Sequence, residues 1–255
     1  MSALRARCPD CRTLTAVAIG PEYQCHSCGR EFAAGLVRVP RAWGTGGAAM
    51  AAAAQMALPW PEAAVIDEAT LDAQNDALAR ELPARPLVLG GCCCSHVGAV
   101  RELARRHGRV AVVWIDAHGD LNTPASSPSG NAWGMPLRML IDAGDVAPAD
   151  VTLLGARNLD PPEEDFIAAA GIRRELGELT GRVYVALDGD VTEPGELDVF
   201  MPEPAKAGEP AGIPLDRLEA LLASIPAPTG AGFTGFVASA RNEAALTRLG
   251  LALGL

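Results

Sequence analysis

The sequence predicts an α/β fold in which a mainly parallel sheet lies between two layers of helices, preceded by a small cysteine-rich module. From residue 36 onward, short apolar runs alternate with amphipathic or alanine-rich stretches, and the first 28 residues carry the paired cysteines of CPDC and CHSC. Continuous apolar runs are typical of strands buried on both faces, and helical crossovers between them make the strands parallel. We therefore predict a module over 1–35 and a three-layer α/β/α domain over 36–255.

The apolar runs predict the strands, and the stretches between them predict the helices. The predicted strands are 36–39, 63–66, 86–90, 110–117, 151–156, 183–188 and 232–240. The predicted helices lie near 46–58, 69–82, 96–107, 135–143, 162–170, 214–224 and 243–253. In such sheets the reactive groups follow the carboxyl ends of the strands.

The first four cysteines have the spacing of a zinc ribbon. Cys8 and Cys11 form one CxxC pair, Cys25 and Cys28 form the other, and 13 residues separate the pairs. Four thiolates in two knuckles complete a closed tetrahedral site, so we predict one structural Zn²⁺. Reduced thiols without metal or a redox CxxC are the alternatives, and His26 within the second pair is an alternative ligand.

Composition narrows the classes of partner. The chain has 255 residues and a net charge of −10, from 21 basic and 31 acidic residues, which disfavours nucleic acid and anionic lipid and favours small or cationic ligands. No stretch has the roughly 18 apolar residues of a membrane span, and the first residues lack the apolar core of a signal peptide. We therefore expect a cytoplasmic protein without a membrane partner, and leave a homo-oligomer open.

Acidic side chains and one imidazole follow two of the predicted strands. Asp116, His118 and Asp120 alternate in DAHGD, and Asp188 and Asp190 alternate in DGD. Side chains at alternate positions of a strand leave the same face, and this much buried negative charge requires cations. Ligands rich in carboxylate suit a hard divalent ion such as manganese. The alternative is that DAHGD is a capped polar turn and DGD a hairpin turn.

At these motifs the chain resembles the arginase (ureohydrolase) family, whose signatures are GGDHS, DAHxD and DxD. The resemblance covers approximately residues 36–255 and is specific at DAHGDLNTP, SPSGNAWGMP and ALDGDVTEP. It implies an arginase-like fold with a dinuclear manganese centre. In that centre Asp116 and Asp188 would bridge two Mn²⁺ ions, His118 and Asp190 would hold one ion, and Asp120 would help to hold the other.

The run GGCCCSH stands where the family has GGDHS. Aligning the glycines puts Cys93 in the place of the family's histidine ligand, with Cys92 and Cys94 as packing residues. A thiolate can bind a divalent ion, although it is a softer ligand than imidazole. The substitution is similar to that in the hydroxyarginine amidinohydrolases, the closest branch in pattern. His96 is a rival ligand, which a helical step would carry away from the strand end.

The resemblance also assigns substrate contacts. Asn122, Ser129 and Asn131 match the residues that hold the α-carboxylate of an amino acid, and Asp160 matches the residue that faces its α-amino group. Two positions depart from the arginases. Trp133 replaces the histidine that shuttles protons, and no residue near the C-terminus matches the glutamate that binds the guanidinium, because Glu243 falls a few positions late.

These observations predict a metal-dependent hydrolase that cleaves a guanidino-type C–N bond of an arginine-like or hydroxyarginine-like amino acid. Metal-activated water would attack the trigonal carbon, and Asp120 would pass the proton to the leaving nitrogen. Without the shuttle histidine, a less basic leaving group such as a hydroxyguanidine is easier to expel. One alternative is an inactive or divergent relative that acts as a binding module through its zinc ribbon, and another is hydrolysis of a different C–N bond.

Overall fold

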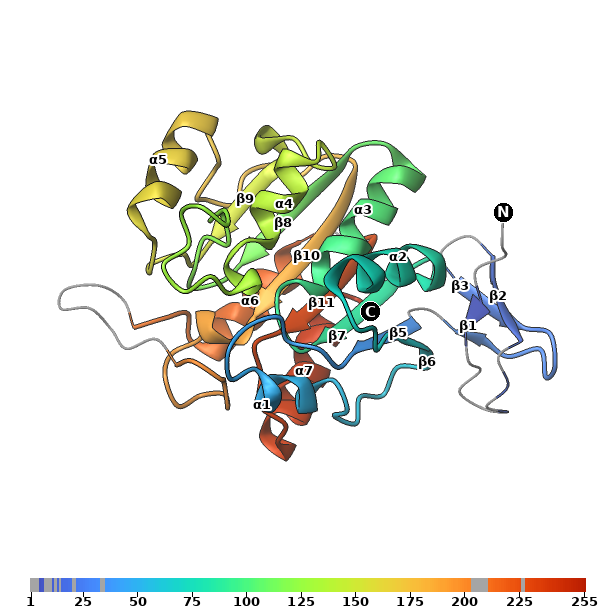
Figure 1. Cartoon of the computed structure of the whole chain (residues 1–255). Coiled ribbons are helices and arrows are strands. Elements are labelled where there is room, and N and C mark those ends of the chain that lie inside the picture. Colours follow the sequence, from blue (N-terminus) through green and yellow to red (C-terminus); the bar gives the residue numbers. More distant parts are fainter. Residues whose placement is uncertain are drawn as a thin grey trace.

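A computed structural model describes residues 5–6, 11, 13, 15–19, 22–32, 35–202, 211–225 and 228–255 (Figure 1). The N-terminal part forms a small antiparallel sheet of four strands in the order β1-β2-β3-β4. These strands are β1 (Arg5–Ala6), β2 (Ala16–Ile19), β3 (Glu22–Cys25) and β4 (Glu31–Phe32). The small sheet ends at Phe32 and the first strand of the large sheet begins at Gly35.

The large sheet has seven parallel strands in the order β6-β5-β7-β11-β10-β8-β9. Its strands are β5 (Gly35–Val39), β6 (Glu62–Val65), β7 (Pro86–Gly90), β8 (Val110–Ile115), β9 (Val151–Leu154), β10 (Arg182–Asp188) and β11 (Gly230–Thr234). Because β7, β11, β10 and β8 are neighbours, their carboxyl ends, and the loops that follow them, meet at one edge.

Helices cover both faces of this sheet (Figure 1). They are α1 (Ala48–Ala53), α2 (Leu71–Glu81), α3 (Ser95–His107), α4 (Pro136–Asp142), α5 (Pro161–Ala170), α6 (Leu215–Ser224) and α7 (Ala240–Ala252). Alternate residues of β8 separate the two cores: Val112 and Trp114 pack with α2 to α5, whereas Val113 and Ile115 pack with α1, α6 and α7. The three-layer α/β/α prediction is confirmed.

Three predicted strands extend at least two residues beyond the observed ones, by two residues at 110–117 and 151–156 and by six residues at 232–240. The run 232–240 was expected to be extended throughout, but β11 ends at Thr234 and α7 begins at Ala240. Gly235 turns the chain with φ +78°, and the side chain of Ser239 caps α7 by accepting a hydrogen bond from the Asn242 backbone N–H. Residues 235–239 therefore form a loop above the sheet edge.

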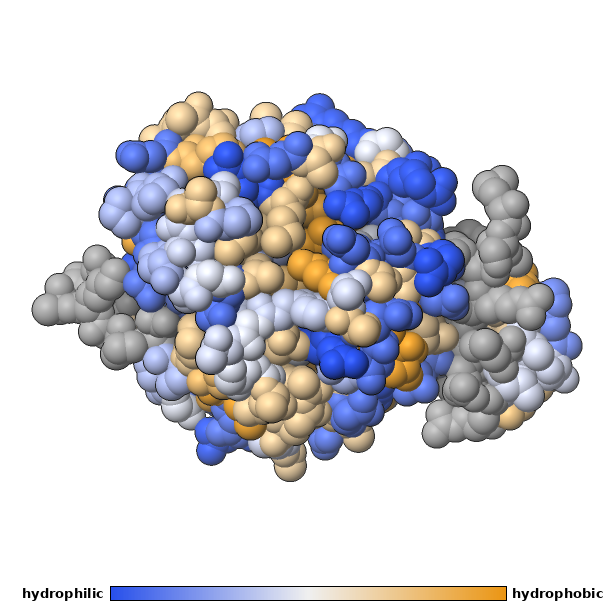
Figure 2. Space-filling view, in the orientation of Figure 1, coloured by the Kyte–Doolittle hydropathy of each residue, from blue (hydrophilic) through white to orange (hydrophobic). Residues whose placement is uncertain are grey.

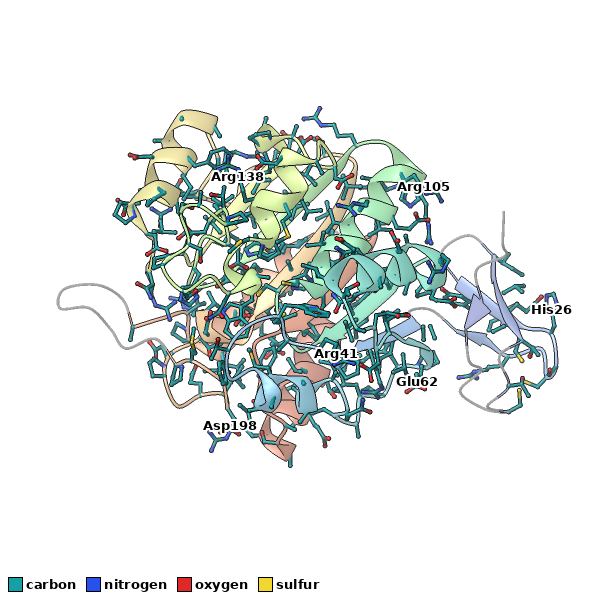
Figure 3. The ribbon with its side chains drawn as sticks, viewed as in Figure 1. His26, Arg41, Glu62, Arg105, Arg138 and Asp198 are labelled. Carbon is teal, nitrogen blue, oxygen red and sulfur yellow. The ribbon has the colours of Figure 1, made fainter. Side chains whose placement is uncertain are left out.

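The small sheet packs against the large domain through Tyr23. This side chain is fully buried in the same core as Leu78 and Leu82 of the α2 segment, and its hydroxyl accepts a 2.6 Å hydrogen bond from the Ala84 backbone N–H. His26 lies on the outer side of the small sheet (Figure 3). On the face seen in Figure 2, strongly hydrophilic residues gather over α2 and α3. Among the described residues, no helix has both the length and the apolar character needed to span a bilayer.

Candidate metal centre

A cavity of about 280 Å³ opens at the carboxyl edge of the large sheet. Six carboxyl groups line it, and the described lining includes no lysine or arginine. The acidic residues are Asp116, Asp120, Asp160, Glu163, Asp188 and Asp190. The lining also includes His118, Asn158, Cys92, Cys93, Asn122, Ser127, Ser129, Pro128, Gly134, Gly235, Met50, Trp133, Phe200 and Met201. This charge suits cations, whether metal ions or the positive groups of a substrate.

Asp116, His118 and Asp120 line this cavity, but a loop directs them rather than strand alternation. β8 ends at Ile115, one residue before Asp116. The Asp116 carboxylate accepts a 2.8 Å hydrogen bond from the His118 backbone N–H, which forms a tight turn. Asp120 has φ +53°, the one positive value at a non-glycine residue in the described ranges. This uncommon backbone conformation aims the Asp120 carboxyl at the cavity.

Asp188 and Asp190 are likewise brought together by a turn. Asp188 is the last residue of β10, and a 3₁₀ turn covers Gly189–Val191. Asp188 Oδ1 accepts a 3.1 Å hydrogen bond from the Asp190 backbone N–H, and Asp190 Oδ1 accepts one from Ala117 N–H at 3.1 Å. The second contact fixes the β10 loop against the β8 loop.

The oxygens of Asp116 and Asp188 face two different sides. Asp116 Oδ1 lies 3.5 Å from His118 Nδ1, whereas Asp116 Oδ2 lies 3.7 Å from Cys93 Sγ. Asp188 Oδ2 lies 2.9 Å from Cys93 Sγ, while Asp188 Oδ1 faces the Asp190 backbone. His118 Nδ1 is 3.0 Å from Asp190 Oδ2. Asp116 thus lies between a Cys93 side and a His118 and Asp190 side, whereas Asp188 contacts Cys93 with one oxygen and the Asp190 backbone with the other.

The structure brings Cys93, and not His96, to the carboxyl cluster. Cys93 lies in the loop between β7 and α3. His96 lies in the first turn of α3 and is held elsewhere, with Nδ1 3.0 Å from the Tyr184 hydroxyl and Nε2 3.2 Å from Thr234 Oγ1. Burial lowers the pKa of His96 to about 3, so the ring is neutral. Of the neighbours of Cys93, Cys94 is fully buried, and Cys92 also lines the cavity and accepts a hydrogen bond from Trp43 N–H.

At the cavity, two groups of three side chains have ligand atoms that lie within 4.8 Å of one another. One is Cys93, Asp116 and Asp120, and the other is Asp116, His118 and Asp190. Burial and the charge of Asp190 raise the pKa of Asp188 to about 7, and burial raises the pKa of Asp116, Asp120 and Asp190. Asp120 Oδ2 is buried and has no hydrogen-bond partner within the described part of the chain. Cations would stabilise this arrangement, so the residues fit a pair of divalent ions.

Three of the four residues matched to amino-acid recognition line the cavity, namely Asn122, Ser129 and Asp160. Asn122 Nδ2 donates to Asp160 Oδ2 at 2.8 Å, and Asn122 Oδ1 accepts from Ser126 Oγ at 2.8 Å. Asn131 is not part of the cavity lining, and its Oδ1 accepts a 2.9 Å hydrogen bond from Thr45 N–H. Asn131 therefore holds the 44–47 loop rather than facing the cavity.

Trp133 lines the cavity, whereas Glu243 lies outside its lining. The Trp133 indole lines the cavity and packs edge-on against Phe200, with ring centroids 6.0 Å apart. A Cβ at Gly44 would lie 2.4 Å from the same indole, so the 44–47 loop needs glycine there. Glu243 lies in α7, outside the cavity lining, and its Oε1 accepts a 2.7 Å hydrogen bond from Ala57 N–H.

Glu163 and Gly235 are cavity residues that the sequence interpretation missed. Glu163 is buried and accepts hydrogen bonds from the backbone N–H groups of Leu121 at 2.9 Å and Asp160 at 3.0 Å. Its spacing from Asp160 is that of a capping box, which predicts a helix start but not a position in a cavity. Gly235 follows β11 and lies against Asp188, since a Cβ there would approach Asp188 Oδ1 to 2.0 Å.

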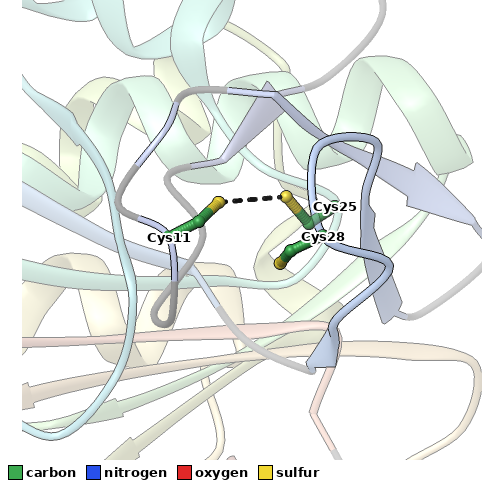
Figure 4. Close-up of side chains that lie close together, drawn as sticks. All are labelled: Cys11, Cys25 and Cys28. Carbon is green, nitrogen blue, oxygen red and sulfur yellow. Dashed lines mark hydrogen bonds between the residues drawn. The ribbon is translucent and has the colours of Figure 1, made fainter.

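The N-terminal cysteines form a separate cluster (Figure 4). Ligand atoms of Cys11, Cys25 and Cys28 lie within 4.8 Å of one another, and the Sγ atoms of Cys11 and Cys25 are 3.5 Å apart. Gly29 follows with φ +76°, and its N–H donates to Cys25 O at 2.8 Å, which closes the knuckle. His26 is exposed and is not a member of the cluster. Cys8 lies outside the described residues.

Comparison with known proteins agrees with this geometry. A sequence model described as the Arginase family matches residues 47–197, more than half of the 255 residues. The chain is 42% identical to the arginase of Staphylococcus aureus (strain COL) over 98 residues, which cover 34% of this chain and 32% of that protein. It is 41% identical to the arginase of Bacillus caldovelox over 143 residues, covering 44% of this chain and 48% of that protein.

A solved structure extends the similarity in fold. The crystal structure of arginase from Bacillus subtilis superimposes with a TM-score of 0.71 at 22% identity, covering 87% of this chain and 97% of that chain. The aligned sequences span less than half of the two curated arginases, whereas the fold matches nearly the whole solved chain. With the family match over more than half of its length and the carboxyl cluster at the sheet edge, this chain belongs to the arginase family.

Proposed function

We propose that the protein hydrolyses a guanidino-type C–N bond of an arginine-like or hydroxyarginine-like amino acid at a dinuclear metal centre. The observation that carries the proposal is the convergence of Cys93 with the DAHGD and DGD side chains in one cavity that also contains Asn122, Ser129 and Asp160. The two groups of candidate ligands share Asp116, as expected for two ions bridged by a carboxylate. Manganese is the ion that the family resemblance implies.

The side chains have distinct roles in this proposal. Asp116 and Asp188 would bridge the ions, His118 and Asp190 would hold one ion, and Cys93 and Asp120 would hold the other. When bound, the ions supply an acidified water and stabilise developing negative charge. Asp120, whose Oδ2 has no hydrogen-bond partner among the residues that the structure describes, would accept the proton of the attacking water and deliver it to the leaving nitrogen.

Substrate recognition would use the polar residues beyond the ions. Asp160 would attract the α-amino group, and Asn122 and Ser129 would donate to the α-carboxylate. Asn122 already donates one N–H to Asp160, which aligns the two groups and leaves its second N–H for substrate. Asn131, which the sequence placed with them, would act indirectly by holding the 44–47 loop through Thr45.

Metal counting and a substrate panel test the function together. The purified protein should contain two divalent ions in the large domain and release urea or hydroxyurea from at least one of arginine, hydroxyarginine, agmatine and guanidino acids, with the amine product in equal amount. A stably folded protein that binds no metal in this domain and cleaves none of the panel would contradict the proposal. That result would favour a binding module.

Trp133→His should shift substrate preference. Trp133 carries no proton donor suited to a basic leaving nitrogen, so the wild-type protein should favour hydroxyguanidine over guanidine substrates. The imidazole of the variant should reduce this preference by about tenfold or more. The ratio of kcat/KM for the two substrates measures the effect. Trp133→Phe is the matched control, since it also replaces the indole by a smaller ring but adds no proton carrier. An equal shift in both variants would refute the shuttle argument.

We also infer that the N-terminal module holds one structural Zn²⁺ through Cys8, Cys11, Cys25 and Cys28. The proximity of the last three thiols supports this inference. Cys25→Ser should lose the zinc and make residues 1–35 sensitive to protease, because the metal supplies the folding free energy of so small a module, while the large sheet remains folded.

His26→Ala is the control for the ribbon, because it removes an exposed side chain of the same knuckle and leaves all four thiols. It should keep zinc and protease resistance, and loss of zinc in this variant would make His26 a ligand. Unchanged protease resistance of wild-type residues 1–35 after chelation would contradict a structural zinc.

A further inference from the structure

The two sides of the proposed centre offer different chemistry. One side combines the sulfur of Cys93 with carboxylates of Asp116 and Asp120, and the other combines the His118 imidazole with Asp116 and Asp190. Manganese prefers oxygen ligands and forms the weakest complexes among the first-row divalent ions, whereas thiolate favours softer ions such as zinc. The donors therefore fit manganese on the His118 side and fit it poorly on the Cys93 side.

The Cys93 side has the features of a built site. Cys93 is 5% exposed, and its Sγ lies among three oxygens, those of Asp116 at 3.7 Å, Asp188 at 2.9 Å and Thr234 at 3.3 Å. Asp120 is 3% exposed, and its Oδ2 has no hydrogen-bond partner among the described residues. A buried oxygen without a hydrogen-bond partner is destabilising, and a bound cation would stabilise it.

A buried chain of polar groups supports the sulfur from behind. The Thr234 hydroxyl lies 3.3 Å from Cys93 Sγ and 3.2 Å from His96 Nε2, and His96 Nδ1 lies 3.0 Å from the Tyr184 hydroxyl. A neutral His96 can accept at one nitrogen and donate at the other, so it orients both hydroxyls. Such outer contacts hold a metal ligand in place and tune its affinity. His96 thereby becomes a positioning residue rather than a ligand.

We propose that the centre holds two different ions, zinc beside Cys93, Asp116 and Asp120, and manganese beside Asp116, His118 and Asp190. The thiolate retains zinc at one position in the presence of excess manganese, while the shared Asp116 keeps the two ions adjacent. This inference rests on one part of the proposed function, the dinuclear centre. It does not depend on the substrate.

A metal challenge on the full chain tests the assignment. Metal-free protein is loaded with zinc, challenged with excess Mn²⁺, freed of unbound metal and analysed for both elements. The wild type should retain one more zinc than Cys93→His, which should exchange all zinc of the large domain for manganese. The Cys25→Ser background, measured in parallel, removes the ribbon zinc from the count. Electron paramagnetic resonance should show isolated Mn²⁺ in the wild type and a coupled pair in Cys93→His.

Cobalt provides a second readout that needs no activity. Co²⁺ bound to a thiolate gives a near-ultraviolet charge-transfer band, and the difference between wild type and Cys93→Ser cancels the ribbon, which is identical in both. The band should lose the contribution of one sulfur in Cys93→Ser and keep it in Cys94→Ser. Cys94 is a matched control because it is also buried but lies outside both ligand groups.

Two results would overturn the inference. One is equal zinc retention in wild type and Cys93→His, and the other is an unchanged cobalt band in Cys93→Ser. Both readouts are independent of turnover. If the wild-type protein cleaves no substrate of the panel but retains one zinc in the large domain, only the proposed function is contradicted. Guanidine hydrolysis by a wild-type protein that holds two manganese ions would defeat only this inference.

Discussion

Asp116→Asn and Asp188→Asn should each abolish hydrolysis and reduce the occupancy of both metal positions. Asp116 lies between the Cys93 side and the His118 and Asp190 side, and Asp188 contacts Cys93 and the Asp190 backbone. Because both are the proposed bridging ligands, a neutral amide in place of either one would weaken the binding of two ions at once. We expect activity to fall at least about a thousandfold, the ratio that corresponds to about 4 kcal/mol of lost transition-state stabilisation. Turnover and the count of bound ions, measured on the same preparation, check this result.

Two controls sharpen the comparison. His118→Asn removes a ligand from one side only and should cost mainly one ion. Asp145→Asn removes a carboxylate that pairs with Arg101 at 3.0 Å, away from the cavity lining, and should leave both ions bound. Selective loss of a single ion in Asp116→Asn or Asp188→Asn would show that these groups do not bridge.

Gly235→Ala should weaken metal binding although it changes no ligand. Gly235 has φ +78°, and a Cβ there would lie 2.0 Å from Asp188 Oδ1 and 2.4 Å from Oδ2. The methyl group must displace the carboxyl group, so we expect metal affinity to fall by about tenfold or more, or about 1.4 kcal/mol. Calorimetric titration of metal into the metal-free variant measures the loss.

Gly181→Ala separates this collision from backbone strain. Gly181 has φ +80°, close to that of Gly235, but a Cβ there would meet no atom within 4 Å. Both variants should lose about 1–2 kcal/mol of stability from the left-handed backbone conformation. Only Gly235→Ala should lose metal affinity, and equal metal affinity in the two variants would rule out the collision.

The architecture was predictable because its signals are local. The predicted strands 86–90, 110–117 and 183–188 match β7, β8 and β10 to within two residues at each end, and the stretches between the apolar runs form helices of the described residues. The arginase resemblance rested on short contiguous motifs, so it too could be seen without the fold. The end of β11 was missed, because the apolar run continues past Thr234 while Gly235 turns the chain.

The sequence by itself determined the fold class, the order of its elements and the residue types gathered at the strand ends. The tertiary structure decided which of those residues meet. It placed Cys93 in the cluster and sent His96 to Tyr184 and Thr234, it left Asn131 outside the cavity, and it brought Glu163 inside. Periodicity and motifs describe neighbours along the chain, whereas a site is formed by side chains from loops far apart in sequence, whose directions depend on turns and packing.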